Sequence, residues 1–167
     1  MSITYNSGIV TEGLTLNLDV SNSKSRLGSN LISNSTNITN YPANQNVTIS
    51  QNGIYIQAVT NQNTSTPGVY PITNGAISVT ANTYYTVRIN AYSTGSTPYL
   101  YVYGINSATN LVWTGTAIGS TQGWYENTFN TGSNTSINVG LLWSGPTTGS
   151  TIMIADYGLY QTSTWYD

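Results

Sequence analysis

Apolar and polar residues alternate with a period of two in several stretches of the chain. Such alternation places one set of side chains on each face of a β-strand. In residues 84–91, Tyr85, Val87 and Ile89 fall on one face, whereas Thr86 and Arg88 fall on the other. The same pattern predicts strands in residues 14–20, 54–58, 77–81, 84–91, 99–103, 124–129, 137–143 and 152–157.

Each predicted strand is expected to bury its apolar positions. The residues assigned to the core in this way are Ile54, Ile56, Ala58, Ile77, Val79, Ala81, Tyr85, Val87, Ile89, Ala91, Leu100, Val102, Ile137, Val139, Leu141 and Trp143. Asn-Gly and Gly-Pro pairs between the strands favour tight turns, because Asn and Gly tolerate positive φ. Short strands separated by such turns predict an all-β fold, an antiparallel β-sandwich of about 8–10 strands with negligible helix.

Residues 21–48 differ from the rest, because they are dense in Ser and Asn and alternate only weakly. We expect a long irregular connection there, following a first strand in residues 14–20. This divides the chain into residues 1–29, an N-terminal strand or arm with a linker, and residues 30–167, the sandwich.

Composition narrows the functions that this fold can serve. The chain has 167 residues, of which 38% are hydrophobic and only 5% are charged, and its net charge is −2. A protein without a positive surface has little attraction for nucleic acid or anionic membranes. The sequence contains no apolar run of about 20 residues and no signal-peptide pattern at its start, so we expect neither membrane insertion nor secretion by that route.

Groups that commonly perform catalysis are scarce. The chain has no His and no Cys, which removes the usual bases, nucleophiles and zinc ligands. Within the predicted sandwich, Glu126 and Asp156 are the only carboxylates apart from the terminus. We therefore expect no enzyme activity and no cofactor. Asp156 is a candidate ligand for a structural calcium ion, although a simple strand-end role explains it as well.

Aromatic residues supply the candidate binding groups. Tyr99, Tyr101 and Tyr103 lie on one face of their predicted strand, and Tyr92 is a candidate neighbour. Tyrosine rings stack on the apolar faces of sugars, and their hydroxyls form hydrogen bonds. The same rings would also suit a protein interface or ordinary packing against another sheet.

The four tryptophans divide by position. Trp143 is in phase with the apolar residues of its strand and is predicted to be buried. Trp113, near a turn, and Trp165, near the terminus, are candidate contacts with a partner, since exposed tryptophan is enriched at binding hot spots.

Four segments resemble carbohydrate-binding modules with a galactose-binding-like jelly roll. In chain order they are Asn30-Leu31-Ile32, residues 81–87 (ANTYYTV), residues 123–129 (GWYENTF) and residues 152–160 (IMIADYGLY). The resemblance implies a jelly-roll sandwich and a core-facing Trp124 at the start of its strand. It also implies that Asp156 corresponds to a calcium ligand of some relatives.

The N-terminal segment resembles a different group of proteins. Residues 9–19 (IVTEGLTLNLD) are similar to the start of structural proteins of tailed phages and cyanophages. Residues 164–167 (TWYD) are similar to a W-x-D element of the same proteins. This resemblance implies a virion protein, foremost a capsid decoration (cement) protein located on the particle. Its partners would be the major capsid protein or tail proteins and copies of itself.

Two hypotheses follow for a non-enzymatic protein. The first is the virion structural protein, with weak binding of glycans as an additional property. The alternative is a tail or fibre component, or a stand-alone carbohydrate-binding module that attaches to polysaccharide on the host surface.

Overall fold

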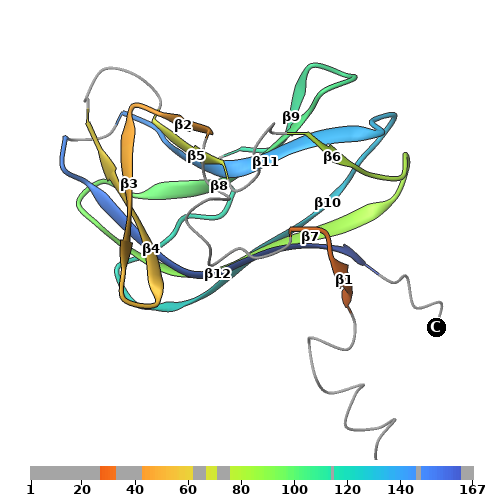
Figure 1. The fold of residues 1–167 in the computed structure, drawn as a ribbon. Coiled ribbons are helices and arrows are strands. Elements are labelled where there is room, and N and C mark those ends of the chain that lie inside the picture. Colours follow the sequence, from red (N-terminus) through yellow and green to blue (C-terminus); the bar gives the residue numbers. More distant parts are fainter. Residues whose placement is uncertain are drawn as a thin grey trace, which may run out of the picture.

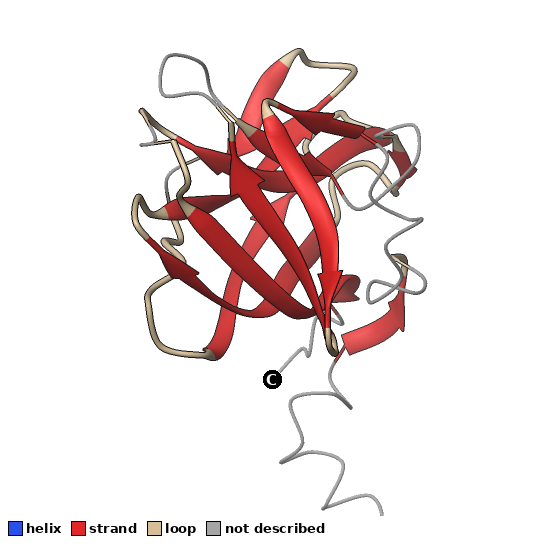
Figure 2. Cartoon of the chain, turned by 60° about the vertical axis from the view of Figure 1, so that its left-hand side comes forward, coloured by secondary structure: helices blue, strands red, loops and turns tan. Residues whose placement is uncertain are grey.

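The alternating stretches form strands that pair into two antiparallel sheets, and no helix is present in the part of the chain described (Figures 1 and 2). The computed structural model describes residues 27–32, 43–61, 67–70, 76–113, 115–145 and 148–162. The predicted antiparallel β-sandwich is therefore confirmed. The described strands number twelve rather than 8–10, because several short strands extend the sheets.

The first sheet, sheet A, contains the longest strands. Its order is β10 (Gly123–Asn130), β7 (Tyr84–Thr94), β12 (Thr151–Thr162), β4 (Tyr55–Thr60) and β3 (Val47–Asn52), with β1 (Leu27–Asn30) paired to β12. The second sheet, sheet B, has the order β2 (Ala43–Gln45), β5 (Gly68–Tyr70), β11 (Ser136–Trp143), β8 (Pro98–Gly104) and β9 (Thr109–Val112), with β6 (Ile77–Ser78) paired to β11.

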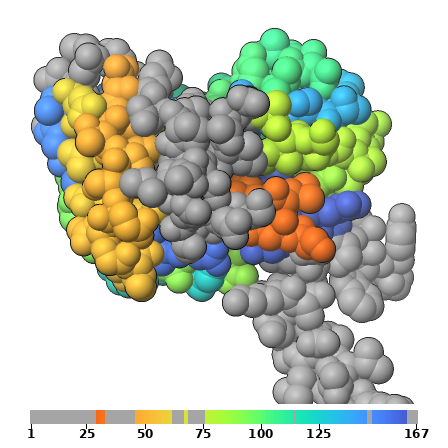
Figure 3. All heavy atoms as spheres, viewed as in Figure 1, coloured from red at the N-terminus to blue at the C-terminus, as the bar shows by residue number. Residues whose placement is uncertain are grey.

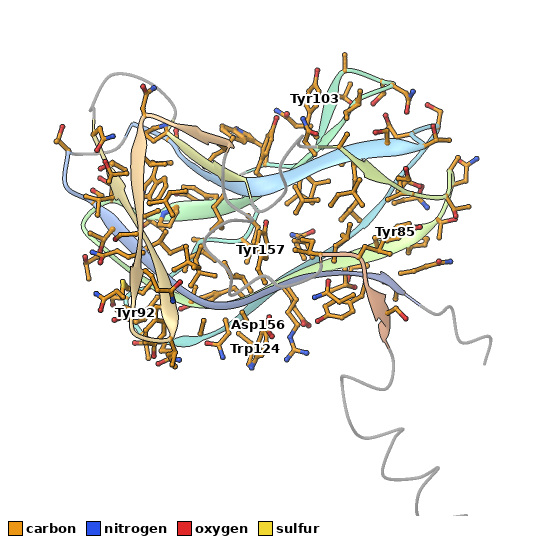
Figure 4. The ribbon with its side chains drawn as sticks, viewed as in Figure 1. Tyr85, Tyr92, Tyr103, Trp124, Asp156 and Tyr157 are labelled. Carbon is orange, nitrogen blue, oxygen red and sulfur yellow. The ribbon has the colours of Figure 1, made fainter. Side chains whose placement is uncertain are left out.

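The core lies between the two sheets and is built from the predicted apolar positions. The fully enclosed residues include Ile56, Ala58, Val87, Ile89, Ala91, Leu100, Val102, Ile137, Leu141 and Trp143. Tyr157 lies between the sheets in Figure 4, and its hydroxyl donates a hydrogen bond of 2.9 Å to the Gly140 carbonyl of the opposite sheet. The only polar group of the Trp143 ring is also satisfied, because Nε1 donates to the Ser96 carbonyl at 3.0 Å.

A β-bulge in β12 changes which residues of that strand face inward. Ile152 and Ile154 are buried before the bulge, and Tyr157 and Leu159 are buried after it. The pairing of β12 with β7 shifts between Ile154 and Asp156, so one extra residue is inserted there. The insertion explains the nearly continuous apolar run in the sequence, and it directs Asp156 to the outer face of sheet A.

Three local predictions are wrong. Ile54 is 71% exposed, because it lies in the turn between β3 and β4, where Gly53 has a φ of +61°. Ala81 lies in a turn with Asn82, since β6 ends at Ser78. The described part of residues 21–48 is not irregular, because β1, β2 and the start of β3 fall within it. Strands of three or four residues are too short to show an alternating pattern.

Other expectations concern residues outside the described ranges. The predicted first strand in residues 14–20 and the turn at Asn74-Gly75 both lie there. Among the described residues, no helix is long and apolar enough to cross a membrane.

Candidate functional site

The three predicted tyrosines of β8 occupy the outer face of sheet B. Along this strand, Pro98, Leu100, Val102 and Gly104 are buried, whereas the tyrosines between them are only partly buried. The alternation arises because successive side chains of a strand point to opposite faces. Tyr99, Tyr101 and Tyr103 therefore form a row on the surface that faces away from the core.

The centre of this row is a group of three rings. Tyr101 and Tyr103 are nearly parallel, with an interplanar angle of 15° and ring centroids 6.4 Å apart. Trp113, which follows β9, meets Tyr101 edge to face at 5.5 Å and is 39% exposed. We call Tyr101, Tyr103 and Trp113 the aromatic platform. Tyr99 continues the row beside Leu142.

Two asparagines flank the platform. Tyr103 pairs with Asn138 of β11 on one side and with Asn110 of β9 on the other. Residues opposite each other in antiparallel strands point to the same face, so both amides lie beside the Tyr103 ring. The Asn138 Oδ1 atom is buried and has no hydrogen-bond partner in the structure. The platform therefore combines apolar ring surfaces with adjacent hydrogen-bonding groups.

The platform carries no full charge. Within residues 27–162 the charged side chains are Arg88, Glu126 and Asp156, and all three belong to strands of sheet A. Figure 4 shows the separation, with Tyr103 on one side of the sandwich and Asp156 on the other. In Figure 3 the turn between β8 and β9 projects at the top of the molecule, adjacent in sequence to Tyr103. A ligand at this face would meet rings, amides and hydroxyls.

Comparisons with known proteins identify the fold. No protein-family model and no curated protein matches the chain. Among solved structures, a family 4 carbohydrate-binding module matches with a TM-score of 0.53 and 16% identity, covering 66% of this chain and 86% of that one. A family 29 carbohydrate-binding module complexed with cellulohexaose matches with a TM-score of 0.51 and 10% identity, covering 80% and 89% of the two chains. The chain has the jelly-roll fold of these carbohydrate-binding modules.

A phage protein shares this fold as well. Tailspike protein 4 of bacteriophage CBA120 matches with a TM-score of 0.53 and 12% identity, over 82% of this chain and 22% of that one. At these identities the likeness extends to the fold alone. The jelly roll implied by the four sequence segments is thus confirmed, whereas the resemblance of residues 9–19 to phage proteins stays a prediction.

The remaining predicted site residues lie apart from the platform. Tyr92 belongs to β7 of sheet A, so its predicted place beside the tyrosine row of β8 is wrong. It contacts Tyr55 edge to face, with ring centroids 5.8 Å apart. Trp165 lies outside the described residues.

Asp156, the candidate calcium ligand, lies on the outer face of sheet A. Its Oδ1 accepts a hydrogen bond of 2.8 Å from the backbone amide of Tyr157. The described residues contain no group of three or more His, Cys, Asp or Glu side chains suited to a metal. The calcium role of Asp156 remains a prediction.

The structure corrects the interpretation of Trp124 and confirms that of Trp143. Trp143 is fully buried, as its phase predicted. Trp124 is 41% exposed, so the core-facing position implied by the resemblance is wrong. In β10 it is Phe129 that is buried and Tyr125 that packs against the core, which leaves Trp124 on the opposite face of the strand.

Sequence reasoning missed Asn110 and Asn138. Both are common polar residues of strands, and neither stands out in the sequence. Their relation to Tyr103 depends on which strands flank β8, and a single sequence does not show this order.

Proposed function

We propose that this protein is a non-catalytic glycan-binding module and that the aromatic platform is its binding face. The observation that carries the proposal is the group of three rings on an outer sheet face, Tyr101 and Tyr103 nearly parallel and Trp113 edge-on. Pyranose rings present C–H groups that pack on aromatic faces, while their hydroxyls need hydrogen-bond partners. The exposed Asn110 amide and the tyrosine hydroxyls supply such partners beside the rings.

The jelly-roll fold supports this proposal, because structures of carbohydrate-binding modules match most of the chain. The absence of His and Cys supports a non-catalytic role, since the common bases and nucleophiles are missing. The uncharged character of the platform favours a neutral glycan or a neutral stretch of a polysaccharide.

Replacement of a platform ring tests the proposal. We expect Tyr101→Ala and Trp113→Ala each to weaken glycan binding by about 1–3 kcal/mol, as loss of an aromatic anchor does. The measurement is isothermal titration with whichever neutral polysaccharide is identified on a glycan array. Tyr84→Ala is the matched control, since Tyr84 is a 49% exposed ring on the opposite sheet. The proposal would be contradicted if no glycan on the array bound the protein. It would also be contradicted if the unmodified protein and the three variants bound with equal affinity.

A second candidate function is a structural role in a phage particle. The observations that favour it are the structural match to a phage tailspike protein and the phage-like residues 9–19, which lie outside the described residues. In this proposal the chain is a capsid decoration protein, or alternatively a tail or fibre component. Its partners are other virion proteins and copies of itself, and the aromatic platform holds cell-surface polysaccharide weakly.

A further inference from the structure

The outer face of sheet A, on the opposite side of the molecule from the platform, gathers groups of a different kind. All three charged side chains of residues 27–162 are in the strands of this sheet, together with the exposed Trp124. Figure 4 shows Trp124 and Asp156 on the side of sheet A that faces away from sheet B. Because the aromatic platform lies on the outer face of sheet B, this region is separate from the site proposed above.

Trp124 is held in place by Arg88. The guanidinium carbon of Arg88 lies 4.0 Å from the centroid of the Trp124 ring, and the Arg88 side chain is only 10% exposed. The arginine thus covers one face of the ring, so the exposed part of Trp124 belongs to its other face and edges. Glu126, two residues along β10, approaches Arg88 Nε to 3.7 Å and adds a weak attraction, because its side chain is 60% exposed. The result is a fixed aromatic surface.

Planar polar groups lie next to this ring. Trp124 pairs with Asn90 across β10 and β7, and Asn90 pairs with Asp156 across β7 and β12. This register forms a transverse row of ring, amide and carboxylate, one strand spacing apart. Gln122 lies beside the row, because its Nε2 donates to Asn90 Oδ1 at 3.5 Å and its Oε1 accepts a hydrogen bond of 3.0 Å from the Tyr55 hydroxyl.

The bulge in β12 is what brings the carboxylate into this row. Without the extra residue before Asp156, strict alternation would place its side chain on the core side of the strand. Gly158, which pairs with Arg88, leaves room for the Tyr160 ring, since a Cβ there would lie 2.5 Å from ring atom Cε2. Gly158 therefore makes room for the Tyr160 ring next to the position that pairs with Arg88.

We propose that Trp124, Asn90, Gln122 and Asp156 form a second saccharide-binding site, which makes the protein bivalent. The exposed ring face would stack on a sugar, and the amides and carboxylate would bind its hydroxyls. A protein partner fits less well, because Asp and Glu are depleted at interface centres and burying the Asp156 and Glu126 carboxylates is costly. One cation and two carboxylates leave the site net negative, so it would accept neutral sugars and repel uronic-acid polymers.

Bivalency gives the proposal a direct test with the full chain. Two sites on opposite faces should cross-link a soluble neutral polysaccharide and precipitate it, as measured by turbidity. The probes are a soluble β-glucan, a xylan and a galactomannan, with polygalacturonate as the acidic comparison. The variants are Trp124→Ala, the double platform variant Tyr101→Ala/Trp113→Ala, and the combination of all three changes. Thermal melting verifies that each variant is folded.

We expect Trp124→Ala and the double platform variant each to bind the neutral probe but no longer precipitate it. The combination should bind at least tenfold more weakly than either, whereas polygalacturonate should bind none of them. Tyr84→Ala is the control, because Tyr84 lies on β7, the strand that also carries Asn90. At about 3.4 Å per residue, the two residues are about 20 Å apart along this strand. The Tyr84→Ala variant should precipitate the probe like the unmodified protein.

The outcomes separate this inference from the proposed function. If Trp124→Ala precipitates normally, or the double platform variant binds nothing, the second site is overturned while the platform can stand. If the double platform variant binds as tightly as the unmodified protein and Trp124→Ala binds nothing, the platform is overturned and the Trp124 site stands. An unmodified protein that binds none of the neutral probes would overturn both.

Discussion

At the scale of single residues, the surroundings of Tyr160 in sheet A change the pKa of its phenol. The ring occupies space that is left by Gly158, near Asp156 and Arg88. Burial raises the pKa of the Tyr160 phenol above 10.0, the Asp156 carboxylate raises it further, and Arg88 partly opposes both effects. A phenolate is therefore less favourable here in the folded protein than in the unfolded chain.

This shift predicts a difference in stability at high pH. The folded protein holds the Tyr160 proton more tightly than the unfolded chain. The contribution of this proton to the free energy of unfolding is therefore fully present below about pH 10 and is lost as pH rises through the folded pKa. Relative to Tyr160→Phe, the unmodified protein should lose stability above about pH 10 and show no extra loss below about pH 9. Urea unfolding of both proteins below about pH 9 and above about pH 10 measures this difference. A stability difference that stays constant with pH would refute it.

At the scale of elements, Asn30 fastens β1 to the last strand of the sheet. Its Oδ1 accepts hydrogen bonds of 2.9 Å from the backbone amides of Leu159 and Ile32. The register between β1 and β12 shifts between Leu27 and Asn30, and the Leu31 amide donates a further hydrogen bond of 2.8 Å to the Leu159 carbonyl. The Asn30-Leu31-Ile32 segment noted in the sequence thus has a physical role, because one side chain joins the start of the described chain to its end.

Removal of this side chain should loosen the junction. We expect Asn30→Ala to reduce the free energy of unfolding by about 1–3 kcal/mol, since two backbone donors lose their acceptor. Chemical denaturation measures the change, and hydrogen exchange at the Leu159 amide should become faster. Asn52→Ala is the matched control, because Asn52 is exposed and hydrogen-bonds the Gln57 side chain. Equal stability of the two variants would argue against the junction.

At the scale of the whole molecule, the sandwich separates two kinds of surface. Sheet B presents rings and amides without full charge, whereas sheet A presents the charged groups and Trp124. A molecule with different faces on opposite sides is suited to joining two objects, such as a polysaccharide and a particle or two polysaccharide chains. Few charges also limit repulsion between neighbouring copies in an assembly.

The particle hypothesis makes a prediction at this scale. If residues 1–26 are the attachment segment suggested by their phage-like sequence, deleting them should abolish incorporation into phage particles. The sandwich itself should still melt cooperatively. Mass spectrometry of purified particles with copy number is the measurement, and hundreds of copies would indicate decoration whereas a few would indicate a fibre. Particles that incorporate the deleted chain normally would count against this assignment.

The sequence by itself determined the sandwich and most of its core. Alternation of apolar and polar residues specifies which face of a strand is buried, and this applied to β4, β7, β8 and β11 because each is long enough to show a period of two. It also determined that Tyr99, Tyr101 and Tyr103 share one face. Where strands were short, as in β1 and β2, or where a bulge inserted a residue, as in β12, the period was hidden or broken.

Only the tertiary structure decided which side chains from different strands become neighbours on a sheet face. The order of strands in each sheet set Asn110 and Asn138 beside Tyr103, and it moved Tyr92 to the other sheet. It also turned Trp124 outward over Arg88. These relations depend on pairing between strands that are far apart in the chain, and alternation within a strand carries no information about its neighbours.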